Sequence, residues 1–345
     1  MRLSRRGYGT AVGLYLRHPS SFAHDTGPHP ENAERLRAVE AALDAEGWLG
    51  LELVEAPQAT RDQLLRVHTP EHVDRIEELC RAGGGMIDMD TIAVEASYDA
   101  ALHAAGGAVG AVDAMLSDGE RVAFCGLRPP GHHAESARAM GFCLFNNVAV
   151  GAAHALEEHG AGRVFVLDWD VHHGNGTDEI FSESDRVLYA SIHQSPLYPG
   201  TGDADDVGTG AGEGFTINLP VSPGSGPDEF LSIVQHVVGP VAREHRPGLI
   251  AISAGYDAHR ADPLAQCMLD AAAYADMTAT MRDLASELDV PLLVCLEGGY
   301  DLDALAESVT ATIAALGDSR PPREAPRAPA ERYLDRVRRD WPSIS

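Results

Sequence analysis

Residues 164–176 read VFVLDWDVHHGNG, a run of apolar side chains that leads directly into carboxylates and imidazoles. The first four residues are continuously apolar, which is typical of a strand buried on both faces of a parallel sheet. In open α/β sheets, ligands collect beyond the carboxyl ends of the strands. The stretch therefore predicts a parallel strand with Asp168, Asp170 and His172 at its functional end.

Similar apolar runs recur along the chain and alternate with longer stretches of helical periodicity. We predict strands at residues 11–16, 122–125, 164–167, 187–192, 249–253 and 292–296. We predict helices at residues 31–46, 70–81, 97–116, 147–158, 228–244, 271–288 and 303–316. This alternation predicts an α/β fold with a central, mostly parallel sheet flanked by helices.

The domain organisation predicted from composition is simple. No linker or change of composition divides the first 317 residues, so we expect one domain over residues 1–317. Beyond Gly317 the sequence becomes rich in Pro and Arg. We expect residues 318–345 to form a polar tail with an amphipathic helical segment around residues 330–339.

The charge of the chain restricts its partners. Its 345 residues include 52 acidic and 26 basic ones, which gives a formal net charge of −26 at pH 7. Such an acidic protein is poorly suited to the phosphate backbone, so we expect no direct nucleic-acid partner. Homo-oligomerisation stays open.

The cysteines and the N-terminal region bear on localisation. Five cysteines are scattered without a CxxC pair, which argues against a disulfide framework and favours a reducing compartment. Arg5-Arg6 is similar to a twin-arginine export signal, but the apolar run after it ends at Arg17 without a small-residue cleavage site. No apolar stretch approaches the roughly 18 residues that span a membrane. We therefore predict a cytoplasmic protein without a membrane partner.

The polar residues after the strands suggest a metal site. In an extended segment alternate residues share a face, so Asp168, Asp170 and His172 are expected to point the same way. Carboxylate and imidazole ligands suit zinc or another borderline divalent metal, and Asp257 is the natural third ligand. Taken alone, an Asp-x-Asp-x-His motif is also typical of a solvated loop. That alternative weakens because other polar residues occupy equivalent strand ends, namely His132, His133, Asn175 and Tyr300.

These motifs resemble those of the histone deacetylase and acetylpolyamine amidohydrolase superfamily, and are nearest to its class II-like branch. The resemblance extends from about residue 11 to residue 316. The matching motifs are, in order, His24-Asp25, His29-Pro30-Glu31, RPPGHHA at 128–134, GFC at 141–143, DxDxHHGNG at 168–176, SAGYD at 253–257, Asp262-Pro263 and LEGGY at 296–300.

The resemblance implies an arginase/deacetylase-like three-layer fold, with a histone deacetylase-like catalytic domain over residues 1–317. It also implies one catalytic zinc ion per chain, held by Asp170, His172 and Asp257. The implied reaction removes acetyl or other acyl groups from lysine side chains of proteins by metal-activated water. A structural potassium ion near Asp168 and Ser191 is implied as well.

The same resemblance assigns catalytic roles to further residues. His133 would act as general base and later as acid, His132 as its electrostatic partner, and Tyr300 as a hydrogen-bond donor to the oxyanion. Asp168 would contact His132, and Asn175 would contact His133. Because a carboxylate partner favours an imidazolium and a neutral amide does not, we expect His133 to be the freer of the two to accept a proton.

The resemblance also implies a substrate tunnel. Phe142 and Tyr198 match the positions of its two aromatic walls, with Gly141 beside the first wall and Leu264 at the gate. Apolar walls suit the methylene stem of lysine. As an alternative, both aromatic residues could belong to the core. Cys143 lies beside the tunnel in sequence, and we expect either a sensitive thiol or an inert buried one.

Other functions stay open at this point. Arginases share the fold but bind two metal ions, and they need an additional Asp where this chain has Gly255. Some acetylpolyamine deacetylases place Glu at the position of Leu264, so an acylated lysine peptide or protein is favoured over an acetylated polyamine. A non-catalytic acyl-lysine binding protein is disfavoured because Tyr300 is present. We expect residues 83–93 to rim the entrance, with Asp88 or Asp90 holding the substrate backbone.

Overall fold

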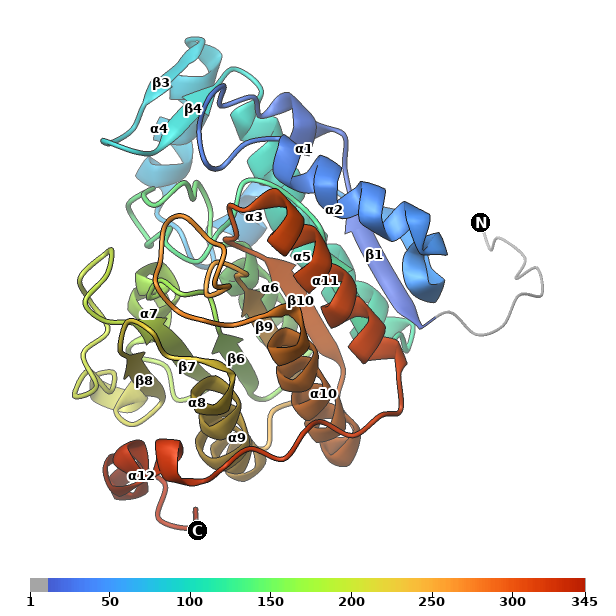
Figure 1. The fold of residues 1–345 in the computed structure, drawn as a ribbon. Coiled ribbons are helices and arrows are strands. Elements are labelled where there is room, and N and C mark those ends of the chain that lie inside the picture. The colour runs from blue at the N-terminus through green and yellow to red at the C-terminus, as the bar shows by residue number, and fades with distance from the viewer. Residues whose placement is uncertain (1–11, 345) are drawn as a thin grey trace.

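The computed structural model describes residues 12–344, and its centre is an eight-stranded parallel sheet (Figure 1). The features predicted at Arg5-Arg6 and at residue 11 lie outside the described residues. The strands are β1 (Gly13–Arg17), β2 (Leu51–Glu55), β5 (Val122–Cys125), β6 (Val164–Asp168), β7 (Val187–Gln194), β8 (Thr216–Val221), β9 (Leu249–Ala254) and β10 (Leu292–Leu296). Their order across the sheet is β2-β1-β5-β10-β9-β6-β7-β8. The predicted parallel α/β fold is confirmed.

The two strands of this sheet that the sequence did not predict are its edge strands. β2 reads LELVE and exposes most of its side chains, and β8 contains Pro220. Edge strands tolerate charged residues and proline because they pair on one side only. A search for continuously apolar runs therefore finds the interior strands and misses these two.

Helices cover both faces of the sheet and complete the predicted three layers (Figure 1). One face packs under α2, α8, α9, α10, α11 and α12, and the other under α4, α5 and α6. The helices are α1 (Ser20–Ala23), α2 (Glu34–Ala45), α3 (Arg61–Leu64), α4 (Pro70–Arg81), α5 (Ser97–Ser117), α6 (Asn147–Glu157), α7 (Asn175–Phe181), α8 (Pro227–Ile233), α9 (Gly239–His245), α10 (Ala271–Leu288), α11 (Leu302–Gly317) and α12 (Ala328–Asp340).

The predicted helix at residues 228–244 is divided in the structure. α8 passes into a π-helical turn at Val234–Val238 before α9 begins. Pro240 lies in the first turn of α9 and has no backbone N–H to donate to the preceding turn. The backbone hydrogen bonds of the helix therefore change from the α-helical to the π-helical pattern in the turn before the proline.

The expectation that no apolar segment reaches membrane-spanning length is wrong for α5. Among residues 12–344, this helix is long and apolar enough to cross a membrane by length and composition. However, 61% of its most apolar 18-residue window is buried in the protein, and it packs against α6 and β5. It is built as a core helix.

The C-terminal segment packs against the body of the protein. The predicted helix at residues 330–339 is present as α12, and its apolar face lies against α8. Tyr333, Leu334, Val337 and Trp341 are buried in the same core cluster as the sheet. The indole N–H of Trp341 donates to the carbonyl of Gly214 at 2.8 Å. The segment predicted as a polar tail thus contributes to the core.

Candidate active site

Three ligands that are distant in sequence meet at the carboxyl edge of the sheet. Asp170 and His172 follow β6, and Asp257 follows β9. Their ligand atoms lie within 4.8 Å of one another, and all three residues are buried. His172 Nδ1 lies 3.1 Å from an oxygen of Asp170 and 3.1 Å from an oxygen of Asp257. The prediction that these residues lie together is confirmed.

The chain does not reach this arrangement as the extended segment that was predicted. The strand ends at Asp168, and the following residues form bends. Asp168 accepts a hydrogen bond from the N–H of Asp170 at 3.1 Å, and Asp170 accepts one from the N–H of His172 at 2.9 Å. The Val171 N–H donates to Asp257 at 2.9 Å. Aspartate side chains commonly fix such turns by bonding the backbone two residues on.

The donor set fits a borderline divalent metal such as zinc, because it combines two carboxylates with one imidazole. Burial lowers the pKa of His172, but its hydrogen bonds to Asp170 and Asp257 outweigh burial and raise the pKa to about 10. The cluster therefore attracts a positive charge. A divalent cation bound by the three side chains would take the place of the imidazolium proton.

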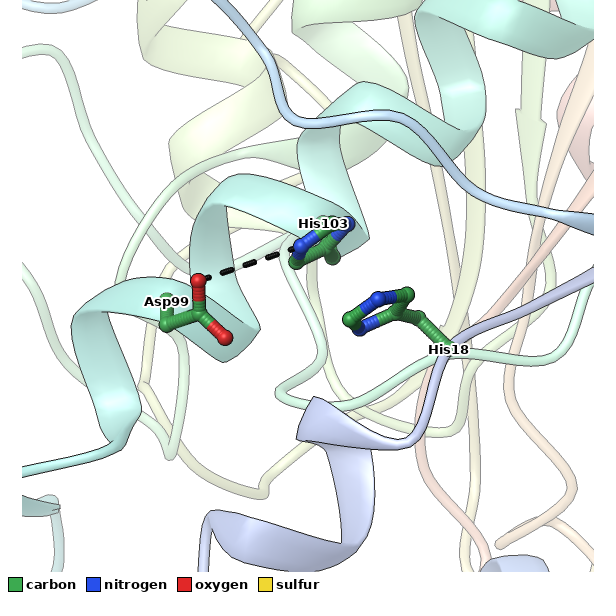
Figure 2. Close-up of side chains that lie close together, drawn as sticks. All are labelled: His18, Asp99 and His103. Atoms are coloured by element: carbon green, nitrogen blue, oxygen red, sulfur yellow. Dashed lines mark ion pairs between the residues drawn. The ribbon is translucent and has the colours of Figure 1, made fainter.

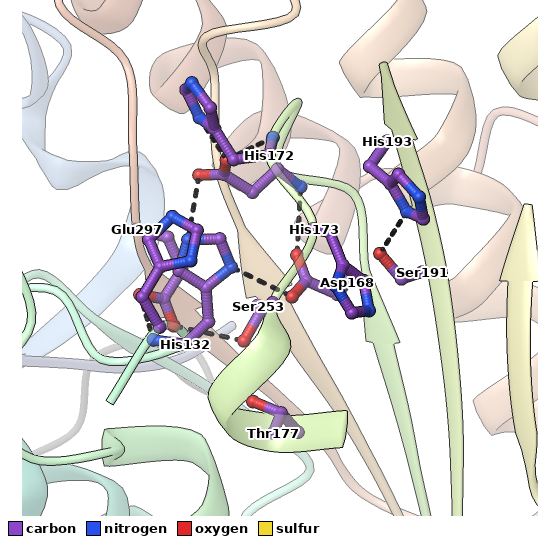
Figure 3. Close-up of polar contacts among 12 residues, drawn as sticks. His132, Asp168, His172, His173, Thr177, Ser191, His193, Ser253 and Glu297 are labelled. Atoms are coloured by element: carbon purple, nitrogen blue, oxygen red, sulfur yellow. Dashed lines mark hydrogen bonds and ion pairs between the residues drawn. The ribbon is translucent and has the colours of Figure 1, made fainter. Parts of the chain in front are cut away.

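The two neighbouring histidines have different partners, as predicted, and Figure 3 shows His132 beside Asp168. His132 Nδ1 lies 3.0 Å from Asp168, whereas His133 Nδ1 lies 2.8 Å from the amide oxygen of Asn175. Burial lowers the pKa of His132, but the charges of Asp168 and Asp170 outweigh it and raise that pKa well above the usual value. Burial and the neighbouring His132 and His172 lower the pKa of His133 well below it. His132 is therefore the charged imidazole and His133 the neutral one.

Hydrogen-bond geometry fixes which nitrogen of His133 is available. The Asn175 amide donates to Glu135 at 2.8 Å, so its oxygen faces His133. An amide oxygen only accepts, and His133 must therefore carry its proton on Nδ1. The lone pair of Nε2 is left as a proton acceptor.

Glu297 supports the loop that carries His132 and His133, a role that the sequence analysis did not assign. It accepts hydrogen bonds from the N–H groups of Gly131 and His132 at 2.6 and 3.1 Å. It also accepts one from the Ser253 hydroxyl at 3.0 Å (Figure 3). Burial raises the pKa of Glu297 to about 7. The only signal in the sequence was its place in the LEGGY motif.

A second buried network lies behind the site and was also not predicted. The Arg35 guanidinium donates to the carbonyls of Gly299 and Glu297 at 2.6 and 2.5 Å. Arg128 forms an ion pair with Glu31, and both are buried. Burial opposes ionisation of Glu31, but Arg128 holds the pKa of that carboxyl well below its usual range. The network fixes the backbone next to Tyr300.

A cavity of about 450 Å³ leads from the surface to His133 and His172. The predicted residues Gly141, Phe142, Tyr198, Leu264 and Tyr300 all line it. The rings of Phe142 and Tyr300 meet edge to face with 5.8 Å between centroids. Tyr198 is partly exposed at the mouth, so the alternative that both aromatic residues belong to the core is wrong. Leu264 is partly exposed there as well.

Gly141 is required by its backbone and by its neighbour. Its φ is +56°, a conformation that favours glycine, and a Cβ there would lie 2.3 Å from the His133 ring. Gly141 thereby lets the chain at Phe142 approach the His133 ring closely.

The rim of the cavity is a hairpin of β3 (Gly84–Met86) and β4 (Ile92–Val94), within the predicted loop. The structure separates the two candidate aspartates. Asp90 lines the cavity, whereas Asp88 accepts hydrogen bonds from the N–H groups of Asp90 and Thr91 and so holds the hairpin turn. Cys143 is fully buried, and burial raises the pKa of its thiol well above the usual value. The inert alternative therefore holds for Cys143.

The predicted potassium ligands lie side by side. Asp168 and Ser191 are paired residues in the register of β6 and β7. The Ser191 hydroxyl also lies 2.9 Å from His193 Nδ1 (Figure 3). The potassium ion itself stays a prediction.

Comparison with known proteins gives one consistent family. A model of the histone deacetylase domain matches residues 29–316. The chain is 42% identical over 305 residues to a probable deacetylase of Archaeoglobus fulgidus, covering 87% of this chain and 84% of that protein. It is 38% identical over 321 residues to the human polyamine deacetylase HDAC10, covering 88% of this chain and 48% of the human protein. The crystal structure of the HDA15 HD domain superposes with a TM-score of 0.90 at 39% identity, covering 97% of each chain.

Removal of one carboxylate should weaken the metal site. Asp257→Asn should lower the affinity of the triad for Zn²⁺ by more than about 100-fold, because even residues that only support metal ligands contribute 10- to 100-fold. Titration of the metal-free protein with Zn²⁺ measures this effect. His133→Ala, which removes an adjacent imidazole outside the triad, should retain the affinity. Unchanged Zn²⁺ binding by Asp257→Asn would contradict the assignment.

Replacing the amide next to His133 by a carboxylate should reverse its protonation preference. Asn175→Asp should raise the pKa of His133 by on the order of 1–3 units, because an adjacent negative charge favours the imidazolium. NMR titration of the imidazole signals measures the shift. Asn32→Asp makes the same charge change elsewhere and should leave His133 unaffected. A pKa that stays in place in Asn175→Asp would refute the pairing.

Proposed function

Since the chain belongs to the histone deacetylase family and is a deacetylase of that family, we propose that its substrates are acylated lysine side chains of proteins. Removal of acyl groups other than acetyl is included in the proposal. One observation carries it. The cavity that reaches His172 of the triad is lined by Phe142 and Tyr198, and the residue at its gate, Leu264, is uncharged.

The cavity suits the stem of a lysine side chain. Four methylene groups between the peptide backbone and the amide would lie along the faces of Phe142 and Tyr198. An acetylated polyamine carries further ammonium groups, which would be better served by a carboxylate at the gate. Leu264 offers none there. Asp90, which lines the rim, would accept hydrogen bonds from a substrate backbone.

In the proposed mechanism the protein residues control the protons. A zinc ion bound to the triad would supply a Lewis acid that polarises the amide carbonyl and activates a water molecule. Nε2 of His133 accepts a proton from that water and later delivers it to the amine nitrogen as the C–N bond breaks. The products are the free amine and the carboxylic acid. The charged His132 beside it stabilises negative charge at the reacting centre.

Tyr300 contributes a hydrogen bond. Its backbone N–H donates to Asp262 at 2.7 Å, and the Arg35 guanidinium lies 5.0 Å from the ring centroid, so the backbone and the ring each have a fixed neighbour. Burial raises the pKa of Tyr300 well above its usual value. The phenol therefore stays protonated and can donate to the developing oxyanion.

The structure disfavours the arginase alternative. A Cβ at Gly255 would lie 2.0 Å from an oxygen of Asp170, so this backbone has no room for the additional aspartate that a second metal ion at this centre requires. Presence of Tyr300 and of both histidines likewise favours catalysis over silent binding of acyl-lysine.

Loss of the Tyr300 hydroxyl should slow the chemical step. Tyr300→Phe should reduce kcat by on the order of 10²–10³ with little change in KM, because the hydrogen bond is made to charge that develops during the reaction. Steady-state kinetics with an acetyl-lysine peptide measure both constants. Tyr98→Phe, which removes the hydroxyl of a tyrosine that does not line the cavity, serves as the control. A loss below threefold in Tyr300→Phe would exclude the oxyanion role.

The substrate class is tested by direct competition between two kinds of substrate. The wild-type protein should hydrolyse acetyl-lysine peptides with a higher kcat/KM than acetylated polyamines. Leu264→Glu should shift the ratio toward polyamines by at least tenfold, since it places a carboxylate at the gate. Leu264→Gln, which matches the size without the charge, should not. A wild-type preference for acetylated polyamines would replace the lysine assignment by the polyamine one.

A further inference from the structure

A second group of metal-ligating side chains lies away from the active site, on the α5 side of the sheet edge (Figure 2). His18 follows the end of β1, whereas Asp99 and His103 lie one helical turn apart on α5. Their ligand atoms lie within 4.8 Å of one another. Glu55, the last residue of β2, adds a carboxylate oxygen 3.4 Å from His18 Nε2.

Hydrogen bonds leave the Nε2 atoms of both imidazoles directed toward carboxylates. His103 Nδ1 lies 2.8 Å from the backbone carbonyl of Ala56, which can only accept, so Nδ1 carries the proton and Nε2 the lone pair. His103 Nε2 in turn lies 3.8 Å from Asp99. Metal-binding histidines usually donate their other N–H in this way, to a carbonyl, a carboxylate or water.

His18 faces a carboxylate through the same nitrogen but in the other tautomer. Its Nδ1 accepts a hydrogen bond from the Ser20 N–H at 3.2 Å, so Nε2 carries the proton and faces Glu55. A cation at Nε2 would move that proton to Nδ1, where the Ser20 hydroxyl 2.8 Å away can accept it in place of the Ser20 N–H contact. The His18 and His103 rings are stacked, with centroids 3.4 Å apart and planes 10° apart. Convergence of both Nε2 atoms on one ion requires the rings to rotate out of this stack.

We propose that His18, His103 and Asp99 form a second divalent-metal site, with Glu55 as a fourth ligand, and that its ion joins the ends of β1 and β2 to α5. Two imidazoles and two carboxylates suit Zn²⁺ or a similar transition-metal ion. The histidine side chains are 16% and 12% exposed, and Asp99 and Glu55 are more open, so the ion can enter from solvent. Such an ion stabilises the folded chain by binding it and not the unfolded one.

A second cluster of one aspartate and two histidines differs from the proposed site because an arginine contacts one of its imidazoles. Asp113 lies 2.7 Å from Nε2 of both His154 and His159. However, the Arg66 guanidinium donates to His154 Nδ1 at 2.9 Å. His154 therefore keeps its proton on Nε2 and donates it to Asp113. Because the guanidinium occupies Nδ1 of His154, this cluster serves as an internal control.

The experiment is a count of metal ions in the full chain after removal of metal and equilibrium dialysis against buffered Zn²⁺. Wild type should bind two ions per chain. His103→Ala and Asp257→Asn should each bind one, and the double variant should bind none. His159→Ala should still bind two. His103→Ala should retain the deacetylase activity of the wild type, because the catalytic triad is intact.

Thermal unfolding gives an independent readout that does not depend on activity. Zn²⁺ beyond the amount that fills the catalytic triad should raise the Tm of the wild type and of His159→Ala by several degrees, but not that of His103→Ala. Asp99→Asn, an exposed and conservative change, should behave like His103→Ala and guards against a folding defect in that variant.

One ion per chain in the wild type, or two in His103→Ala, would overturn the proposal. Loss of both ions in Asp257→Asn alone would instead indicate a binuclear catalytic centre. Either outcome is separate from the deacetylase assignment, which is measured by turnover.

Discussion

Burial of negative charge at one edge of the sheet is the constraint on which the rest of the site depends. Asp168, Asp170, Asp257 and Glu297 are all fully buried within a few residues of strand ends. Buried carboxylates are costly unless they are paired and hydrogen-bonded. Here the buried negative charge is compensated by backbone N–H groups, by the imidazoles of His132 and His172, and by the predicted divalent cation. The same groups that make this charge tolerable also set the protonation states of His132 and His133 on which the proposed mechanism rests.

The glycines next to these carboxylates serve the same constraint. A Cβ at Gly298 would lie 2.0 Å from Asp257, and the Gly298 N–H donates to Asp170 at 2.9 Å. Gly255 approaches Asp170 equally closely. The glycine backbone therefore packs directly against the carboxylates, in space that a side chain at either glycine would need. Neither glycine position has room for a further carboxylate side chain beside the triad.

Much of the fold and of the site could be predicted from the sequence because its signals are local. The interior strands are continuously apolar, and the Asp-x-Asp-x-His motif marks the end of β6 directly. The edge strands could not be found in this way, since β2 alternates charged and apolar residues and β8 contains Pro220. The hydrogen bonds of Glu297 to the loop that carries the histidines could not be predicted either, because only the fold brings Gly131 and Ser253 close to it. The packing of Trp341 was missed for the same reason. The composition of the C-terminal segment predicts a polar tail, but four of its apolar side chains, Trp341 among them, are buried in the core.

The position of β10 has a consequence for biosynthesis. This strand is the last of the sheet in the sequence, yet it lies between β5 and β9 near the middle. A nascent chain that ends before Leu292 can therefore form only two partial sheets, each with an unpaired interior edge, and unpaired edges are prone to aggregation. Non-local pairing of this kind also slows folding. The two halves can join only after β10 has left the ribosome, so every shorter nascent chain keeps both of these edges unpaired.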